Sequence, residues 1–334
     1  MRDSQTDCPP KTILVVGGAG YIGSHMVREL HDTGYRPVVF DNLSMGYRES
    51  LEPGILVEGD LGDPAALEQL FSEHSFDAVM HFASFIQVGE SVAEPLKYYQ
   101  NNVANTLNLL EAMRKHGVKR FVFSSTAAVY GTPDSVPIIE DAQQHPENPY
   151  GQSKLMVEQI LADCDRAWGL SSAVLRYFNA AGAHPSGEIG EAHEPESHLI
   201  PIVLQVALGE RSHITVNGDD YATPDGTCVR DYIHVCDLAS AHTLALKALL
   251  GGRTSFVCNI GIGTGYSIRE VIETCRQVTG HPIPEQTGTR RPGDPAVLVA
   301  SSERMKAEFG WQARYPELRT IVETAWNWHQ KRRY

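Results

Sequence analysis

Short apolar runs alternate with stretches of helical periodicity along the first half of the chain. The apolar runs predict strands at 12–16, 37–40, 55–57, 78–81, 120–125 and 173–178. The stretches between them predict helices that start near residues 21 and 65 and that cover 95–116 and 149–168. Strand and helix repeated in this way indicate a parallel, doubly wound sheet, and strands this uniformly apolar indicate burial on both faces.

The alternation of apolar runs and helical stretches ends after Phe178. A stretch rich in glycine, proline and glutamate runs from residue 179 to residue 195, and we expect a loop there at the border of a second lobe. Further helices are predicted at 199–208, 235–250, 268–279 and 316–332. The expected fold is α/β, with a Rossmann-type doubly wound domain over 11–178 and a smaller C-terminal α/β substrate-binding domain over 179–334. The segment near 231–250 is a candidate for return to the first domain, and residues 1–10 are expected to form a flexible extension.

Composition narrows the range of partners. The net charge of −13 leaves no basic surface for nucleic acid. The first ten residues contain no apolar signal segment and the sequence has no run of about 18 apolar residues, so we expect a soluble cytoplasmic protein without membrane attachment. The six cysteines are scattered without a C-x-x-C pair, and the histidines show no H-x-x-x-H pattern or cluster with cysteine. The sequence therefore predicts reduced thiols and no metal site.

A glycine-rich turn follows the first predicted strand. Gly17, Gly20 and Gly23 lie where strand turns into helix, and such a turn lets the backbone approach a pyrophosphate closely. Asp41 lies 18 residues past Gly23, where a carboxylate accepts hydrogen bonds from the ribose hydroxyls of a dinucleotide. Because no arginine follows before Arg48, we expect NAD rather than NADP. Taken singly these residues are weak evidence, since ordinary turns use glycine and aspartate often closes a strand.

A tyrosine and a lysine share one face of a predicted helix. Tyr150 and Lys154 are four residues apart, and a nearby ammonium together with the positive nicotinamide ring would lower the tyrosine pKa towards the range of a general base. Thr126 brings a hydroxyl to the C-terminal edge of the sheet, where such folds bind ligands. A bare tyrosine–lysine pair is usually a surface feature. Its order after the glycine turn and the hydroxyl-rich strand end favours an active site in which Tyr150 takes a hydroxyl proton while hydride passes to NAD.

Segments along nearly the whole chain resemble UDP-glucose 4-epimerases of the extended short-chain dehydrogenase/reductase superfamily. In the first half these segments are GGAGYIGSH at 17–25, HFA at 81–83, VGES at 88–91, NNV at 101–103 and VYG at 129–131. In the second half they are LRYFN at 175–179, GAHPSG at 182–187, DGT at 225–227, VRDYIHV at 229–235 and RRPGD at 290–294. Only the first ten residues lie outside the resemblance.

The resemblance implies an activity and an assembly. It implies that the sugar of a UDP-hexose is oxidised at carbon 4 with NADH formed in place, rotates as a 4-keto sugar, and receives the hydride on its other face. NAD would then be a retained prosthetic group. It also implies a homodimer that pairs through the predicted helices at 95–116 and 149–168.

The resemblance also implies roles for individual residues. Tyr150 would be the base, Lys154 its electrostatic partner and a ligand of the NAD ribose, and Thr126 the hydroxyl that helps to hold the sugar oxygen. The implied cofactor contacts are Gly17, Gly20, Tyr21, Ile22, Gly23, Asp41, Asn42, Asp60, Leu61, Phe82, Ala83, Asn101, Tyr150, Lys154 and Phe178. The implied substrate contacts are Thr126, Asn179, His198, Leu199, Arg230, Arg291, Asp294 and Leu298.

Four positions depart from a common pattern of the family. Thr126 replaces a frequent serine and keeps its hydroxyl, whereas Ile86 lies where many members carry a lysine near the cofactor. His198 stands where an asparagine often meets the substrate. Leu298 occupies a position that is tyrosine in members restricted to UDP-glucose and UDP-galactose, and a smaller side chain there makes room for an N-acetyl group.

Three alternatives remain open at this stage. Sugar-nucleotide 4,6-dehydratases resemble this chain in their tyrosine–lysine pair, but they carry a Thr-Asp-Glu motif where this chain has Thr126, Ala127 and Ala128. UDP-glucuronate decarboxylases typically keep a glutamate at the last of these three positions. A non-catalytic NAD-binding sensor is the third alternative, because fold alone does not determine activity.

Overall fold

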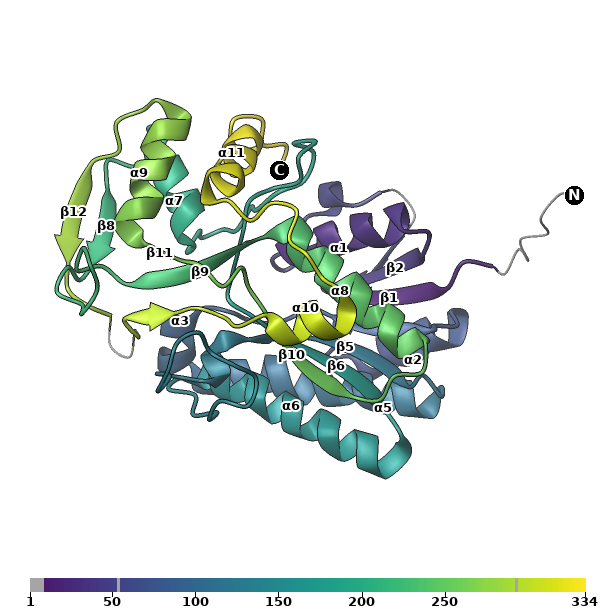
Figure 1. Ribbon diagram of the computed structural model, residues 1–334. Helices are drawn as coiled ribbons and strands as arrows, with labels where there is room; N and C mark the ends of the chain where they lie inside the picture. The colour runs from purple at the N-terminus through teal and green to yellow at the C-terminus, as the bar shows by residue number, and fades with distance from the viewer. Residues whose placement is uncertain (1–8, 53–54, 292–293) are drawn as a thin grey trace, which may run out of the picture.

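A seven-stranded sheet forms the larger unit of the computed structural model, which describes residues 9–52, 55–291 and 294–334 (Figure 1). Every strand pair within this sheet is parallel. In order across the sheet, the strands are β10 (Phe256–Ile260), β6 (Ser171–Tyr177), β5 (Arg120–Thr126), β4 (Ala78–His81), β1 (Thr12–Val16), β2 (Arg36–Asp41) and β3 (Leu56–Glu58). The predicted α/β fold with a parallel sheet is confirmed.

The central strand β1 shows why these apolar runs fold in this way. Ile13 and Val15 pack against one layer of helices, and Leu14 and Val16 pack against the layer on the opposite face. Successive side chains of a strand alternate between faces, so a strand covered on both sides must be apolar throughout. The first layer contains α1 (Tyr21–Asp32) and α8 (Val235–Leu250), and the second contains α2 (Pro64–Glu73), α5 (Asn105–Lys115) and α6 (Pro149–Trp168) (Figure 1).

The helix predicted over 95–116 is divided into three segments. They are α4 (Pro95–Tyr99), the π-helical segment η2 (Gln100–Ala104) and α5. The side chain of Asn102 explains the change of winding, because it bonds to the backbone of a neighbouring loop: its Oδ1 accepts from the N–H of Phe85 at 2.9 Å and its Nδ2 donates to the Phe85 carbonyl at 3.0 Å. A π-helical turn inserted in an α-helix often marks a functional position, and Asn101 lies in this one.

The smaller unit is built around strand β9 (Val229–His234). Strands β7 (Asn179–Ala181) and β13 (Val297–Leu298) pair parallel to β9, and β11 (Gly265–Ser267) pairs antiparallel to it. The stretch expected to be a loop from residue 179 onwards therefore begins with a short strand. The remaining elements of this unit are the helices α7 (Leu199–Ala207), α9 (Ile268–Thr279) and α11 (Leu318–His329), and the paired strands β8 (Ile214–Asn217) and β12 (Glu285–Gly288).

The chain returns from the smaller unit to the larger one. Helix α8 follows β9 directly and packs beside α1, after which β10 joins the edge of the seven-stranded sheet next to β6. Helix α10 (Glu303–Phe309) lies close to α8 and β10. The chain therefore passes between the two units several times.

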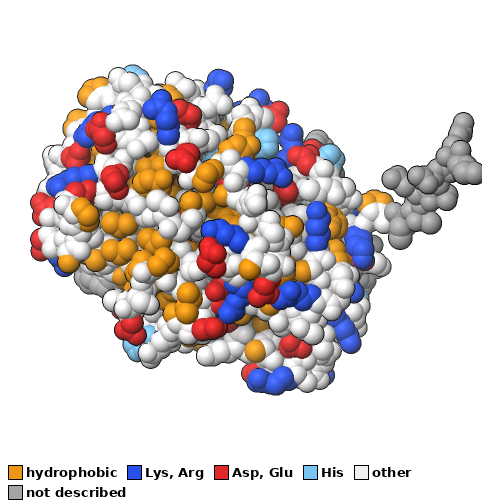
Figure 2. Space-filling view, in the orientation of Figure 1, with side chains coloured by type: hydrophobic (Ala, Val, Ile, Leu, Met, Phe, Trp, Pro, Cys, Tyr) orange, Lys and Arg blue, Asp and Glu red, His pale blue; other side chains and the backbone are white. Residues whose placement is uncertain are grey.

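The surface carries charged and hydrophobic side chains side by side. Figure 2 shows basic and acidic side chains interspersed over one face, with hydrophobic side chains between them. Among the described residues, no helix is both long and apolar enough to cross a membrane.

Candidate active site

A single cleft, called here the main cleft, opens where the parallel strands of the large sheet end. It is lined by residues that follow or close β1 to β6, by the start of α1 and by the chain from Phe178 to Ala180, with His193 and His198 at its border. All the residues expected to contact the cofactor line this cleft, from Gly17 in the first turn to Phe178 after β6. Ligands in doubly wound sheets bind at this edge.

The glycine turn between β1 and α1 is tightly packed at two of its three glycines. A Cβ atom on Gly17, whose φ is +76°, would lie 2.4 Å from the backbone nitrogen of Ala83, and one on Gly23 would lie 2.1 Å from the Gly17 carbonyl oxygen. A Cβ on Gly20 would come no nearer than 3.5 Å to its surroundings. Gly17 and Gly23 are therefore required by the fold, whereas Gly20 leaves room beside the positive end of α1 for a pyrophosphate.

Asp41 ties this turn to the second strand. Its Oδ2 accepts a hydrogen bond from the backbone N–H of Ala19 at 2.9 Å, and its Oδ1 accepts one from Leu43 at 2.8 Å. Burial raises the pKa of this carboxyl, and the two backbone hydrogen bonds act in the opposite direction. The side chain of Asn42 donates to Asp60 at 2.6 Å. Asp41, Asn42 and Asp60, three of the residues expected to contact the cofactor, all line the main cleft.

Tyr150 and Lys154 lie in the first turns of α6. The side chain of Asn148 caps this helix by accepting from the N–H of Gly151 at 2.9 Å, and Pro149 occupies its first position. The Nζ of Lys154 is buried and donates to the carbonyl of Ser124 at 2.9 Å. Thr126, at the end of β5, lines the cleft with both residues, so the structure brings the three predicted catalytic side chains together.

The ionisation of these groups differs from the expectation for a tyrosine–lysine pair. Burial raises the pKa of Tyr150. A hydrogen bond with the Thr126 hydroxyl opposes this shift but is the smaller effect. Burial also lowers the pKa of Lys154 to about 7, although the Glu158 carboxylate opposes this shift. A lysine that is only partly charged at neutral pH gives little support to a phenolate. The protein without the nicotinamide ring, whose charge is part of the expected decrease, thus raises the pKa of Tyr150.

A second cavity lies beside the main cleft in the smaller unit. His198 lines the main cleft, whereas its neighbours Ser197 and Leu199 line the second cavity, so the two spaces adjoin at the start of α7. Arg291 and Asp294 also line the second cavity. Six of the eight residues expected to bind the substrate line one or the other of these two spaces, whereas Arg230 and Leu298 line neither.

The other predicted substrate residues lie on or near β9. Arg230 is buried and forms an ion pair with Asp294, and Asn179 lines the main cleft from β7. Leu298 stands opposite Arg230 in the pairing of β13 with β9, and it packs in a cluster with Phe178. Pro292 and Gly293 of the predicted RRPGD segment lie outside the described residues.

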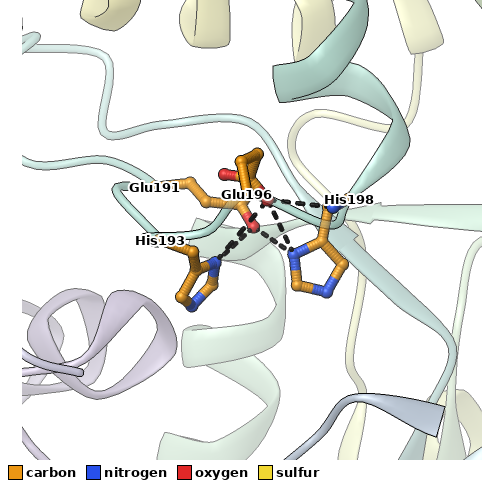
Figure 3. Close-up of side chains that lie close together, drawn as sticks. All are labelled: Glu191, His193, Glu196 and His198. Carbon is orange, nitrogen blue, oxygen red and sulfur yellow. Dashed lines mark hydrogen bonds and ion pairs between the residues drawn. The ribbon is translucent and has the colours of Figure 1, made fainter. Parts of the chain in front are cut away.

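Some residues at the site escaped the sequence patterns. Ser124 and Tyr177 line the main cleft, and their hydroxyl oxygens lie 2.5 Å apart. The run of hydroxyl residues at the end of β5 could have indicated Ser124 from the sequence. A group of two glutamates and two histidines also gathers at the border of the cleft: Glu191, His193, Glu196 and His198 (Figure 3). Spacing rules for histidine and cysteine pairs miss this group because half of its members are glutamates.

Comparisons with known proteins agree with the geometry. The sequence model of the NAD dependent epimerase/dehydratase family matches residues 13–261. The chain is 54% identical over 319 residues to the UDP-glucose 4-epimerase of Halalkalibacterium halodurans, a match that covers 96% of each sequence.

Solved structures show the same relationship. A crystal structure of UDP-glucose 4-epimerase has a TM-score of 0.94 at 51% identity, and the match covers 96% of this chain and 98% of that chain. The UDP-glucose 4-epimerase of Bifidobacterium longum, in complex with NAD+ and UDP, has a TM-score of 0.92 at 43% identity over 96% of this chain and 99% of that chain. The chain therefore belongs to the NAD-dependent epimerase/dehydratase family, among the UDP-glucose 4-epimerases.

Proposed function

We propose that the protein interconverts UDP-glucose and UDP-galactose by inverting carbon 4 of the sugar, with NAD held in the main cleft. The observation that carries this proposal is that Tyr150, Lys154 and Thr126 share one cleft with a glycine turn of the dinucleotide-binding type. The names of the relatives support the choice of substrate, and the complex of the Bifidobacterium longum protein with NAD+ and UDP supports both ligands.

NAD, when bound, supplies a hydride acceptor and donor at carbon 4. Tyr150 would take the proton of the sugar hydroxyl at its phenol oxygen. After the 4-keto sugar has rotated, it would return the proton to the same sugar oxygen while carbon 4 receives the hydride on its opposite face. Thr126 would share a hydrogen bond with the same sugar oxygen. Lys154, oriented by the Ser124 carbonyl, would bind the ribose of the cofactor. The positive charge of the oxidised nicotinamide would favour the phenolate that the protein alone disfavours.

The second cavity is the proposed site for the UDP portion. Arg291 lines it, and a guanidinium binds a diphosphate well because its planar donors match pairs of phosphate oxygens. Arg230 is held by Asp294, and Asn179 and Leu199 would complete the contacts. The sugar would then reach from this cavity past His198 into the main cleft.

Elimination and decarboxylation are less well supported. Ala127 and Ala128 follow Thr126 in a short 3-10 turn and offer no acidic group beside it. Loss of water needs an acid and a base besides the tyrosine. Besides NAD as the hydride carrier, epimerisation needs only the side chains that line the main cleft.

Product analysis tests this function directly. Purified protein without added cofactor is incubated with UDP-galactose, and the products are separated by chromatography. Appearance of UDP-glucose with unchanged mass is the expected result. A product that has lost water or carbon dioxide would favour one of the alternatives above, and NAD binding without turnover of any UDP-hexose would favour a sensor.

We further infer that the protein works as a homodimer. Four large apolar side chains are strongly exposed along α3 (Val88–Ala93), α4 and α5: Val88, Val92, Leu96 and Leu107. Leu96 is 80% exposed and Val92 is 64% exposed. Exposed apolar side chains of this kind are typical of an interaction surface. Leu96 and Leu107 lie within the predicted 95–116 helix, whereas Val88 and Val92 lie just before it on α3 and none of the four lies on α6.

The cytoplasm is the proposed location. The cysteines among the described residues are all free thiols, three of them buried. This state suits a reducing compartment, where NAD and UDP-sugars are also available.

A further inference from the structure

The chain between β7 and α7 carries four side chains of the kinds that bind metal ions, within eight residues. Glu191, His193, Glu196 and His198 direct one ligand atom each towards a common point, and these atoms all lie within 4.8 Å of one another (Figure 3). We propose that these four side chains bind one divalent transition-metal ion, for which zinc suits the ligands best. Imidazole nitrogen and carboxylate oxygen are both common zinc ligands.

The distances in the cluster suit a tetrahedral site. The Nδ1 atoms of His193 and His198 lie 3.1 and 2.5 Å from Oε1 of Glu191, and 3.9 and 3.5 Å from Oε1 of Glu196. Zinc bonds of about 2.0 to 2.2 Å in a tetrahedron place neighbouring ligand atoms roughly 3.3 to 3.5 Å apart. These four separations lie on both sides of this value, and no two of the four ligand atoms are more than 4.8 Å apart, so shifts of about 1 Å would be needed to reach the required geometry.

The charges in the cluster call for a cation. With both imidazoles neutral the group carries two negative charges, and the Glu191 side chain is almost fully buried. Two neighbouring carboxylates away from water are unfavourable unless a positive charge lies between them. The Nδ1 of His198 lies 2.5 Å from a Glu191 oxygen, a separation that suits a proton shared between the two atoms. A bound metal ion would take the place of that proton, because metal ions bind to the deprotonated form of the imidazole.

Surrounding contacts hold the ligands in place. Oε1 of Glu196 accepts from the backbone N–H groups of Ser197 and His198 at 2.8 and 2.9 Å, and the carbonyl of Glu191 accepts from the indole of Trp328 at 2.8 Å. The two backbone bonds end on the same Glu196 oxygen that faces the histidines, so they orient this carboxylate, and a bound ion would share that oxygen with them. The surrounding contacts come from backbone and from a different helix, so the cluster does not depend on the ion alone for its position.

The proposed ion has a structural role. Four protein ligands close the coordination sphere, as in structural rather than catalytic zinc sites. The ring of His193 packs edge-on against Tyr21 of α1, whose hydroxyl donates to the Gly182 carbonyl at 2.7 Å. An ion here would join the chain before α7 to the glycine turn and fix His198 at the border between the main cleft and the second cavity.

Metal analysis of the full-length protein tests the proposal. Protein treated with a chelator and then dialysed with Zn²⁺ should hold about one ion per chain by elemental analysis, and a higher melting temperature than the chelator-treated protein. Co²⁺ in place of Zn²⁺ should give the intense visible absorption of a tetrahedral site. His193→Gln and Glu196→Gln should each lose most of the ion. His184→Gln, in the same stretch of chain but outside the cluster, should keep it.

Three results would overturn the proposal. One is a wild-type protein that takes up far less than one ion and gives no tetrahedral cobalt spectrum. Another is a metal content that survives the combined His193→Gln and Glu196→Gln substitutions. The third is an equal loss of metal in His184→Gln. In the first case the histidines would instead be protonated partners of the two carboxylates. Because metal content and the cobalt spectrum are measured without substrate, failure of the proposed epimerase activity would leave this test unaffected.

Discussion

The phenol of Tyr150 needs positive charge from outside the protein before it can act as a base near neutral pH. Burial raises its pKa, and burial also lowers the pKa of Lys154 to about 7, so the two side chains alone favour a neutral pair. Cofactor and base are thereby coupled: the oxidised nicotinamide that accepts the hydride also favours the phenolate that accepts the proton.

Leu298 is the residue at which substrate breadth can be tested. It lies on β13 opposite Arg230 and packs with Phe178, which lines the main cleft. If the smaller side chain makes room for an N-acetyl group, Leu298→Tyr should reduce turnover of UDP-N-acetylgalactosamine at least tenfold while turnover of UDP-galactose changes little. Parallel assays with both sugars check this, and an equal effect on both would contradict a role in selectivity.

In the turn between β1 and α1, different glycines are needed for the fold and for cofactor binding. A Cβ on Gly20 meets only the Gly17 carbonyl oxygen, at 3.5 Å, so Gly20→Ala should fold normally but crowd the pyrophosphate. The expected result is a thermal transition close to that of the parent and a several-fold loss of NAD that stays bound through gel filtration. Gly89→Ala is the matched control, because nothing lies within 4 Å of the added methyl group. Full retention of NAD in Gly20→Ala would place the pyrophosphate elsewhere.

Helix α8 carries a buried histidine that should make stability depend on pH. Burial lowers the pKa of His242 to about 4, although a hydrogen bond with the Leu238 carbonyl opposes the shift. An unfolded histidine titrates near pH 6.5, so between about pH 6.5 and 4 the unfolded chain binds a proton that the folded chain does not. The free energy of unfolding should therefore fall as the pH decreases through this range.

The slope attributable to one such residue is at most about 1.4 kcal/mol per pH unit. Denaturant titrations between pH 7 and 4, at steps of about one unit, should show a shallower fall for His242→Leu than for the parent. His31→Leu, at an exposed position of α1, should leave the slope as it is in the parent. An unchanged slope in His242→Leu would show that its ring is protonated in the folded protein.

Elements set by local pattern were predicted well, and elements set by distant contacts were not. The strand over 12–16 and the helices over 149–168, 235–250 and 268–279 have the bounds that apolar periodicity and end signals predicted. The π-helical segment η2 depends on Asn102 bonding to the backbone of Phe85, and β7 depends on pairing with β9. Neither partner is adjacent in the sequence, so no local pattern could indicate them.

The candidate site also contains features that local sequence patterns predict and features that depend on distant contacts. The residues assigned to the cofactor line one cleft because the carboxyl ends of parallel strands meet at a single edge. The division of the substrate residues between two cavities, and the meeting of Glu191, His193, Glu196 and His198, depend on how the chain before α7 is folded. Sequence patterns could place these residues on a loop but not direct their side chains.

Assembly is the property of the whole molecule that can be tested most simply. Leu96→Glu and Val92→Glu introduce charges at the most exposed apolar positions of α4 and α3. A buried unpaired charge strongly disfavours association, so the double variant should sediment as a monomer at micromolar concentration while the parent sediments as a dimer. Lys331→Glu changes the net charge by the same amount at an exposed position after α11, outside these helices, and is the control for net charge alone. A parent that sediments only as a monomer would refute the dimer.

The central claim is that Tyr150 acts as the base in the inversion of carbon 4. The measurement that tests it most directly is the rate at which UDP-galactose is converted to UDP-glucose by Tyr150→Phe and by the parent, with bound NAD determined in both. The predicted result is turnover lowered by about a hundredfold or more, with the circular dichroism spectrum and NAD content unchanged. Turnover within a few-fold of the parent, at equal NAD content, would contradict it.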